Sequence, residues 1–369
     1  MKLREFIKEF ELRYPPQWAM ESDKVGLFCG DLNRGVEKIL IALDPSKNVL
    51  EEAASGGYDL LLTHHPVYRS DFKNIIAQDG ASGKLFFAIQ HDIAIYSAHT
   101  NLDFAPDGVS VALAKMLDVE IEDFLHKKSA EKLYKLVVFV PRKDFENFRK
   151  SMLNTGIGCI GKYSHSSFSS SGEGTFFPLD GASPYLGQVG KLEKTEEMRF
   201  ETVVPAHLLK NAVEAIHTYH PYEEPAFDIY PLANDRINGG FGVVGLFEKT
   251  LKLEDVVERC RSKLITNVVR YSGNSGEFVR RVALIGGTGD SLVGDVISAK
   301  ADVFIAGELG HHSIMDLKEA GICAVVPGHF ATEWVILPHI RDVVEEILKK
   351  FEVAGKVDLS EVEEPIFKV

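Results

Sequence analysis

The sequence contains little cysteine and no apolar stretch of membrane-spanning length. Its 369 residues include four cysteines, Cys29, Cys159, Cys260 and Cys323, which lie far apart and form no CxxC pair. This spacing excludes a disulfide framework and a cysteine zinc site. No run approaches the roughly 18 consecutive apolar residues of a transmembrane helix, and the first residues lack the apolar core of a signal peptide. We therefore expect a soluble cytoplasmic protein.

Basic residues are scarce relative to acidic ones. The chain carries 41 lysines and arginines against 54 aspartates and glutamates, so its formal net charge is −13. Nucleic acids are bound by basic surfaces that neutralise their phosphates, and this balance argues against a nucleic-acid partner. A nucleotide-sized ligand, held by a few local groups, remains compatible with it. The length indicates roughly two to three domains.

The first and last parts of the chain are predicted to alternate helices and strands in the same order. Short, nearly continuous apolar runs are typical of parallel strands that are covered on both faces. Histidines directly follow two such runs in each part. We interpret the repeated order as an internal duplication that forms an α/β core of two similar halves. The predicted strands are residues 36–43, 58–63 and 93–98 in the first part, and 281–285, 301–306 and 322–326 in the last.

The middle of the chain has a different pattern. Its expected order is strand, helix, strand, strand, helix, strand, which is typical of a ferredoxin-like α+β domain. A strand at 159–168 is among the predicted elements. Because the flanking parts share an order that the middle lacks, we predict an insertion into the core. The expected boundaries are 1–126 for the first half of the core, 127–239 for the insert, and 240–369 for the second half.

Histidines and carboxylates follow the predicted strands at positions suited to a metal site. Ligands gather at the carboxyl ends of strands in open α/β sheets, and mixed imidazole and carboxylate ligands suit zinc, manganese or iron. A helical turn would place His329 and Glu333 on one face. Pro66 helps the chain leave strand geometry, so that two adjacent histidines can serve one site. The residues concerned are His64, His65, His99, Asp103, His329 and Glu333.

A second cluster follows another predicted strand. Glu308, His311 and His312 could add metal ligands, hold a substrate or act as acid or base near neutral pH. They are equally compatible with an ordinary helix start.

The glycine-rich segment 286–291 joins a predicted strand to a helix, and the absence of GxGxxG spacing favours a tight turn over an anion-binding loop.

One motif of the predicted insert stays open between two interpretations. His220-Pro221-Tyr222-Glu223-Glu224-Pro225 lies at a predicted helix-to-strand junction. Its polar, aromatic and acidic groups could bind a ligand or a metal. Its two prolines, with their fixed φ, favour a rigid turn at a subunit contact.

Taken together, these motifs resemble the family named for the yeast Ngg-interacting factor, also labelled GTP cyclohydrolase I type 2-like. The resemblance implies two similar α/β halves around a dinuclear metal site, usually in ring-shaped hexamers. The middle segments GIGCIGKYSHSSF and HPYEEPAFDIYPL are similar to the PII- and CutA-like extra domain of the longer bacterial members. The matching core pieces are THHP at 63–66, SAHTNLD at 97–103, GGTGDS at 286–291, AGELGHH at 306–312 and GHFATE at 328–333.

The resemblance also implies a ligand set and an activity. Carried over to this sequence, the metal ligands are His64, His65, Asp103, His329 and Glu333, with Glu333 the best bridge between two divalent ions. Two segments depart from the family pattern: Ser22-Asp23-Lys24 replaces a Trp-Asp-Asn sequence, and Val243 replaces an arginine.

The function expected from these observations is that of a metal-dependent hydrolase acting on a nucleotide-like substrate. Two divalent ions per subunit, zinc first and manganese or iron as alternatives, would activate water and substrate. His99 or His311 would shuttle protons, with Glu308 as a further acid or base. The rival hypothesis is a non-catalytic metal-binding regulatory or scaffold assembly. In either case we expect a homohexamer, without a membrane partner.

Overall fold

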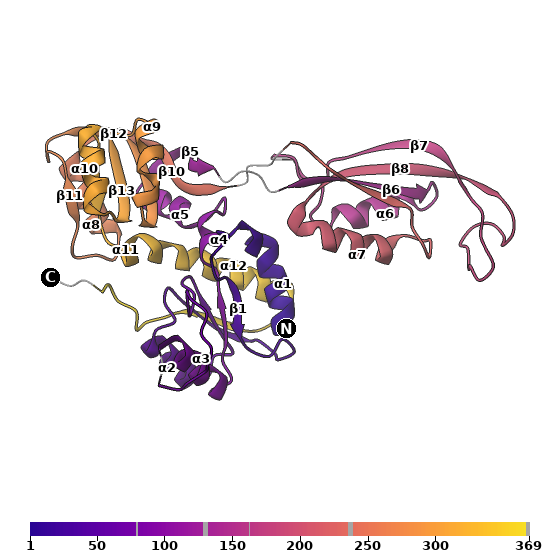
Figure 1. Ribbon diagram of the computed structural model, residues 1–369, viewed down its shortest axis with the longest axis horizontal. Helices are drawn as coiled ribbons and strands as arrows, with labels where there is room; N and C mark the ends of the chain where they lie inside the picture. Colours follow the sequence, from indigo (N-terminus) through magenta and orange to yellow (C-terminus); the bar gives the residue numbers. More distant parts are fainter. Residues whose placement is uncertain (79, 128–131, 162, 235–238, 367–369) are drawn as a thin grey trace. The chain divides into compact units, whose positions relative to one another are not determined.

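The computed structural model is a mixed α/β protein with several sheets (Figure 1). It describes residues 1–78, 80–127, 132–161, 163–234 and 239–366. The chain divides into two compact units, Met1–Lys128 with Asn238–Val369, and Ser129–Ile237. The boundaries predicted near residues 127 and 239 adjoin 128–131 and 235–238, which lie outside the described residues. Within the described ranges, no helix is both long and apolar enough to cross a membrane.

The first sheet of the larger unit has five strands. Four of them are parallel, three as the continuous apolar runs predicted and β15 in addition, and β1 pairs antiparallel at one edge. In spatial order the strands are β1 (Gly26–Cys29), β4 (Ala94–Ser97), β3 (Leu60–Thr63), β2 (Lys38–Ala42) and β15 (Lys356–Leu359).

Helices cover both faces of this sheet. On one face α1 (Leu3–Arg13) and α12 (Leu337–Lys350) lie side by side (Figure 1) and pack against residues such as Leu60. On the other face α2 (Lys47–Gly56) and α3 (Gly80–Gln90) pack against residues such as Leu61. Because successive side chains of a strand enter opposite cores, both positions must be apolar, and burying each leucine contributes roughly 1.5–3 kcal/mol.

The second sheet has six strands, of which the three predicted ones, β12, β13 and β14, are parallel. The remaining three pair antiparallel at its edges. Helices α5 (Val109–Met116) and α8 (Leu253–Lys263) cover one face, and α9 (Val293–Ser298) and α10 (His311–Glu319) the other. The strands, in spatial order, are β11 (Arg270–Ser272), β14 (Cys323–Val326), β13 (Val303–Glu308), β12 (Phe278–Thr288), β10 (Gly240–Lys252) and β5 (Val119–Lys127).

Each terminal part of the chain contributes to both sheets. Strand β15 and helix α12, from the end of the chain, complete the first sheet and its cover. Strand β5 and helix α5, from the first part, join and cover the second sheet. The larger unit is therefore a single structure built from two segments that are distant in sequence.

The smaller unit is a four-stranded antiparallel sheet with helices α6 (Phe145–Leu153) and α7 (Leu209–Tyr219) on one face (Figure 1). Its core includes Phe200, whose ring lies 5.9 Å from that of Phe148. In spatial order the strands are β7 (Ser167–Phe176), β8 (Glu193–Pro205), β6 (Leu133–Pro141) and β9 (Phe227–Pro231).

The strand predicted at 159–168 is wrong in position, because β7 begins at Ser167. Three glycines precede it, Gly156, Gly158 and Gly161, and each has a positive φ that a regular strand does not allow. The apolar residues around them therefore belong to a loop, and the actual strand is the serine- and glycine-rich segment after it.

Candidate metal centre

Histidines at the carboxyl ends of two neighbouring parallel strands begin the candidate site. His64 and His65 follow β3, and His99 follows β4. The backbone amide of His65 still donates to the carbonyl oxygen of Leu43 (2.8 Å), while Thr63 Oγ1 donates to the His65 carbonyl (2.8 Å). These bonds close the end of the strand, so that both adjacent imidazoles reach one site.

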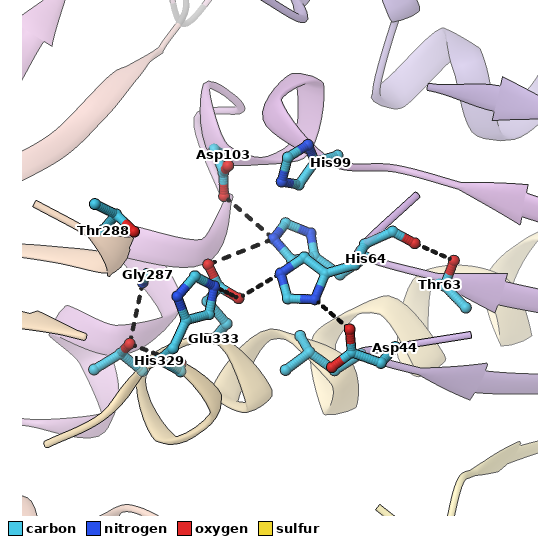
Figure 2. Close-up of polar contacts among 12 residues, drawn as sticks. Asp44, Thr63, His64, His99, Asp103, Gly287, Thr288, His329 and Glu333 are labelled. Atoms are coloured by element: carbon cyan, nitrogen blue, oxygen red, sulfur yellow. Dashed lines mark hydrogen bonds and ion pairs between the residues drawn. The ribbon is translucent and has the colours of Figure 1, made fainter. Parts of the chain in front are cut away.

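A short helix from the far end of the chain supplies the remaining donors. The predicted helical turn exists as α11 (His329–Glu333), which separates from α12 at a 3₁₀ turn, Trp334–Ile336. The helices α11 and α12 (Leu337–Lys350) are therefore separate elements. Figure 2 shows the side chains of His64, His329 and Glu333 pointing toward one another. Residues predicted from three separate sequence fragments thus come together.

The nitrogen and oxygen atoms of this cluster lie close to one another. Glu333 Oε2 lies 2.9 Å from His65 Nε2 and 3.0 Å from His329 Nε2. His64 Nε2 lies 3.9 Å from Glu333 Oε1 and 3.7 Å from Asp103 Oδ1. Two donors that are each about 2.0–2.1 Å from one tetrahedral zinc ion are roughly 3.4 Å apart. The spacing fits donors that share a cation.

Burial makes this arrangement costly unless a ligand compensates it. His64, Asp103 and Glu333 are 2%, 7% and 4% exposed. Among the described residues, the buried atoms His64 Nε2, His65 Nε2 and Glu333 Oε2 have no hydrogen-bond partner of acceptable geometry. An unpaired buried polar atom costs about 1–3 kcal/mol, so three at one point indicate a missing partner. A divalent cation would satisfy all three at once.

Hydrogen bonds at Nδ1 orient the imidazoles of three histidines. His64 Nδ1 bonds the carbonyl oxygen of Ala98 (2.9 Å), His65 Nδ1 bonds Asp44 Oδ1 (2.9 Å), and His99 Nδ1 bonds Asp23 Oδ1 (2.8 Å). Metal-binding histidines usually have such a partner, which fixes the tautomer and leaves the other nitrogen free to bind. The sequence analysis missed both aspartates as site residues. Asp44 directly follows a predicted strand, and this position was the available signal.

Burial and neighbouring charges set the protonation states. Burial lowers the pKa of His64 to about 3, so its ring is neutral near pH 7. Burial would lower the pKa of His65 too, but the carboxylates of Asp44 and Glu333 raise it to about 10. Burial would raise the pKa of Glu333, but the surrounding imidazoles hold it well below its usual range. Burial raises the pKa of Asp103 well above its usual range.

A glycine makes room for the Glu333 carboxylate. Gly287 has a φ of +70°, and a Cβ placed on it would lie 2.2 Å from Glu333 Oε1. Its amide donates to Thr332 Oγ1 (3.1 Å), which ties β12 to α11. The tight turn predicted for 286–289 is wrong in part, because β12 continues to Thr288 with a register shift after Ile285.

The three predicted catalytic residues lie in different surroundings. The ring of His99 lies 5.2 Å and 5.6 Å from those of His64 and His65. Glu308 lies beside the cluster, with its Oε2 3.5 Å from His329 Nδ1. His311 is exposed in the first turn of α10 with His312, and neither lines the cavity at the cluster. The structure brings Glu308 and His99 to the site, but not His311.

The cluster opens into a cavity of about 1220 Å³. Lys24, Arg69 and Lys84 line it, as does the segment near the end of the chain that carries Glu363. Glu363 accepts hydrogen bonds from the amides of Leu43 (2.8 Å) and Asp44 (2.7 Å). No pattern in the sequence predicts this contact. Val243, which replaces a family arginine, is fully buried in the core and does not line the cavity.

Comparison with known proteins decides the family. A sequence model of the family described as Duf34/NIF3 (NGG1p interacting factor 3) matches residues 1–365. The chain belongs to this family. The resemblance that its motifs predicted is confirmed.

Proteins called GTP cyclohydrolase 1 type 2 homolog are similar to this Duf34/NIF3 member over most of its length. The one from Bacillus subtilis is 38% identical over 328 residues, which are 89% of this chain and 88% of that protein. The one from Mycobacterium tuberculosis is 35% identical and covers 90% and 89% of the two chains.

Solved structures of the family have the same fold. A Bacillus cereus protein related to NIF3 has a TM-score of 0.88 at 36% identity, and the match covers 100% of this chain and 99% of that one. The Staphylococcus aureus protein SA1388 has a TM-score of 0.73 at 26% identity, with the same coverage.

Proposed function

We propose that this protein is a metal-dependent hydrolase acting on a nucleotide-like substrate. The observation that carries the proposal is the convergence of three buried nitrogen and oxygen atoms, His64 Nε2, His65 Nε2 and Glu333 Oε2, in a cluster of which His65 and Glu333 line a large cavity. A structural metal site closes its coordination shell with protein ligands, whereas a catalytic site leaves room for a substrate. The names of the relatives favour a nucleotide.

We propose two divalent ions for this site. Two groups of candidate ligands share His65: one comprises His64, His65 and His99, of which we assign only His64 and His65 to the metal, and the other comprises His65, His329 and Glu333. Glu333 has one carboxylate oxygen facing His64 and the other facing His65, as a bridge requires. Asp103 would add a ligand on the side of His64. Nitrogen and oxygen donors of this kind suit zinc first, and manganese or iron as alternatives.

In the proposed mechanism, bound cations supply Lewis acidity that polarises the substrate and activates water. His99 accepts and returns a proton at Nε2, because its Nδ1 is held by Asp23. Glu308 lies on the cavity side of His329 and serves as a further proton carrier. Lys24, Arg69 and Lys84 attract and orient an anionic substrate.

An activity screen tests this proposal. Purified protein loaded with zinc or manganese is incubated with a panel of nucleotides that includes GTP, and formate and phosphate are assayed. We expect one of these products, and its loss in Glu333→Ala. If neither product appears with any metal, the hydrolase proposal fails.

The rival proposal is a metal-binding regulatory or scaffold assembly. The cavity of the smaller unit supports it.

We propose that this unit is a ferredoxin-like insert of the PII/CutA type. Its element order, β6-α6-β7-β8-α7-β9, supports this assignment. We also propose that the larger unit consists of two similar halves and that the protein assembles into a homohexamer. Light scattering of the purified protein, with and without metal, tests the assembly.

A further inference from the structure

The smaller unit has a cavity of about 520 Å³ on the sheet face that its helices leave open. Phe200 of β8 points into the core beneath α6, whereas its neighbour Arg199 lines the cavity. Because successive strand residues face opposite sides, the cavity lies on the side away from the helices. Its size falls in the range of small-molecule sites.

Small residues and a covering loop shape this cavity. Gly172 and Gly174 of β7 line it, and a Cβ on Gly174 would lie 2.2 Å from a Glu197 carboxylate oxygen. The loop that follows β7 is held across the sheet, since the amide of Ser183 donates to Glu223 Oε1 (2.9 Å). The sheet therefore forms the floor of the cavity, and the loop forms a wall.

Tyr222, from the HPYEEP motif, is the central aromatic group of the wall. Its ring centre lies 6.0 Å from that of Phe176 and 6.2 Å from that of Tyr185. Its hydroxyl donates to Glu197 Oε1 (3.1 Å). His220 fixes the turn, because its Nδ1 accepts from the amide of Tyr222 (3.0 Å) and its Nε2 donates to the Phe139 carbonyl (2.9 Å). The wall of the cavity thus combines three neighbouring aromatic rings with a carboxylate that is bonded to one of them.

The charge of the lining is acidic. Arg199, its basic residue, is paired with Glu201 (2.7 Å), and Glu173 is paired with Lys194 (2.8 Å). Within the described residues, the remaining carboxylates of the lining have no basic partner. They are Glu197, Glu223 and Glu224. An anionic ligand would be repelled here, whereas a cation would meet both carboxylates and aromatic faces.

We propose that this cavity binds a small organic cation, an ammonium or guanidinium group on an apolar body. The charged group would lie against the ring of Tyr222 beside the Glu197 carboxylate, and the apolar body would contact Phe176 and Tyr185. Aromatic rings attract cations through their negative faces, and the attraction increases where water is excluded. The HPYEEP motif is then a ligand-binding turn.

Calorimetric titration of the full chain with benzyltrimethylammonium tests the proposal. We expect binding to the unaltered protein, and roughly fivefold or greater weakening in both Glu197→Gln and Tyr222→Leu. The glutamine still accepts the tyrosine hydroxyl bond, so this variant removes charge alone. Tyr222→Phe, which keeps the ring, should retain most of the binding and guards against misfolding of the leucine variant.

Matched controls define what overturns the proposal. Glu146→Gln removes an exposed carboxylate of the same unit, outside the cavity, and should bind as the unaltered protein does. Glu333→Gln should also bind normally, which separates this site from the metal centre. Absence of binding to the unaltered protein, equal binding of benzoate, or unchanged affinity in both Glu197→Gln and Tyr222→Leu would each refute it.

Discussion

His65 Nε2 and Glu333 Oε2 lie 2.9 Å apart, and both atoms are buried. The two residues are 268 positions apart, and the end of a strand and the end of a short helix bring them together. A nitrogen and a carboxylate oxygen this close together are positioned to bind one cation.

Removing the Glu333 carboxylate should abolish tight metal binding. Glu333→Gln keeps the size of the side chain but loses the charge that would neutralise two cations. We expect the metal content of purified protein, measured by plasma mass spectrometry, to fall from near two ions per chain to well below one. The control, Glu345→Gln, changes an exposed glutamate of α12 and should keep the full content. Equal metal content in both variants would contradict the assignment of Glu333.

Metal binding should release protons near pH 7. The pKa of His65, raised to about 10 in the metal-free protein, means that its ring must lose a proton before Nε2 can bind a cation. The pKa of Asp103, also raised, adds to the effect. Affinity should therefore increase with pH over the range below 10. Calorimetry in two buffers of different ionisation enthalpy measures the released protons, and identical heats in both would contradict the prediction.

Gly287→Ala should weaken metal binding although Gly287 is not itself a ligand. The new methyl group would meet Glu333 Oε1 and displace the carboxylate, for which we expect roughly tenfold or greater loss of metal affinity. The positive φ adds about 1 kcal/mol of destabilisation. Gly321→Ala is the matched control, because Gly321 has a φ of +73° and open space around it. It should lose similar stability and keep its metal.

Asp23→Ala should lower turnover while the metal content stays near that of the unaltered protein. Burial would raise the pKa of Asp23, but hydrogen bonds from His99 and Thr100 lower it to about 2, so a carboxylate holds the imidazole. Without it the ring can rotate, and we expect roughly tenfold or greater loss in kcat. Loss of metal in parallel would instead make His99 a ligand.

The segment carrying Glu363 should loosen as pH rises in the metal-free protein. Burial raises the pKa of Glu363 to about 7, although the amides of Asp44 and Leu43 partly offset this. The folded state therefore holds the proton more tightly than the unfolded state, so the contribution to stability is present below about pH 4.5 and is lost as pH rises through 7. Amide hydrogen exchange of residues 361–364, corrected for intrinsic rates, measures it. Glu363→Gln should remove the pH dependence between pH 5 and 8.

The sequence predicted the strands in which every side chain is buried. Strands covered on both faces need apolar side chains at every position, so β2, β3 and β13 were visible as continuous runs. The edge strand β5 carries charged side chains, and its pairing partner β10 lies far away in sequence. Local patterns therefore do not reveal this pairing.

The sequence alone predicted which residues form the candidate metal centre. His64, His65, His329 and Glu333 could be named because imidazoles and carboxylates that follow apolar strands have few structural reasons to be there. The tertiary structure decided their partners: Asp44 and Asp23 behind the rings, Gly287 beside the carboxylate, and Glu363 on the strand end. These contacts join segments up to 320 positions apart, and their geometry exists only after the chain has closed.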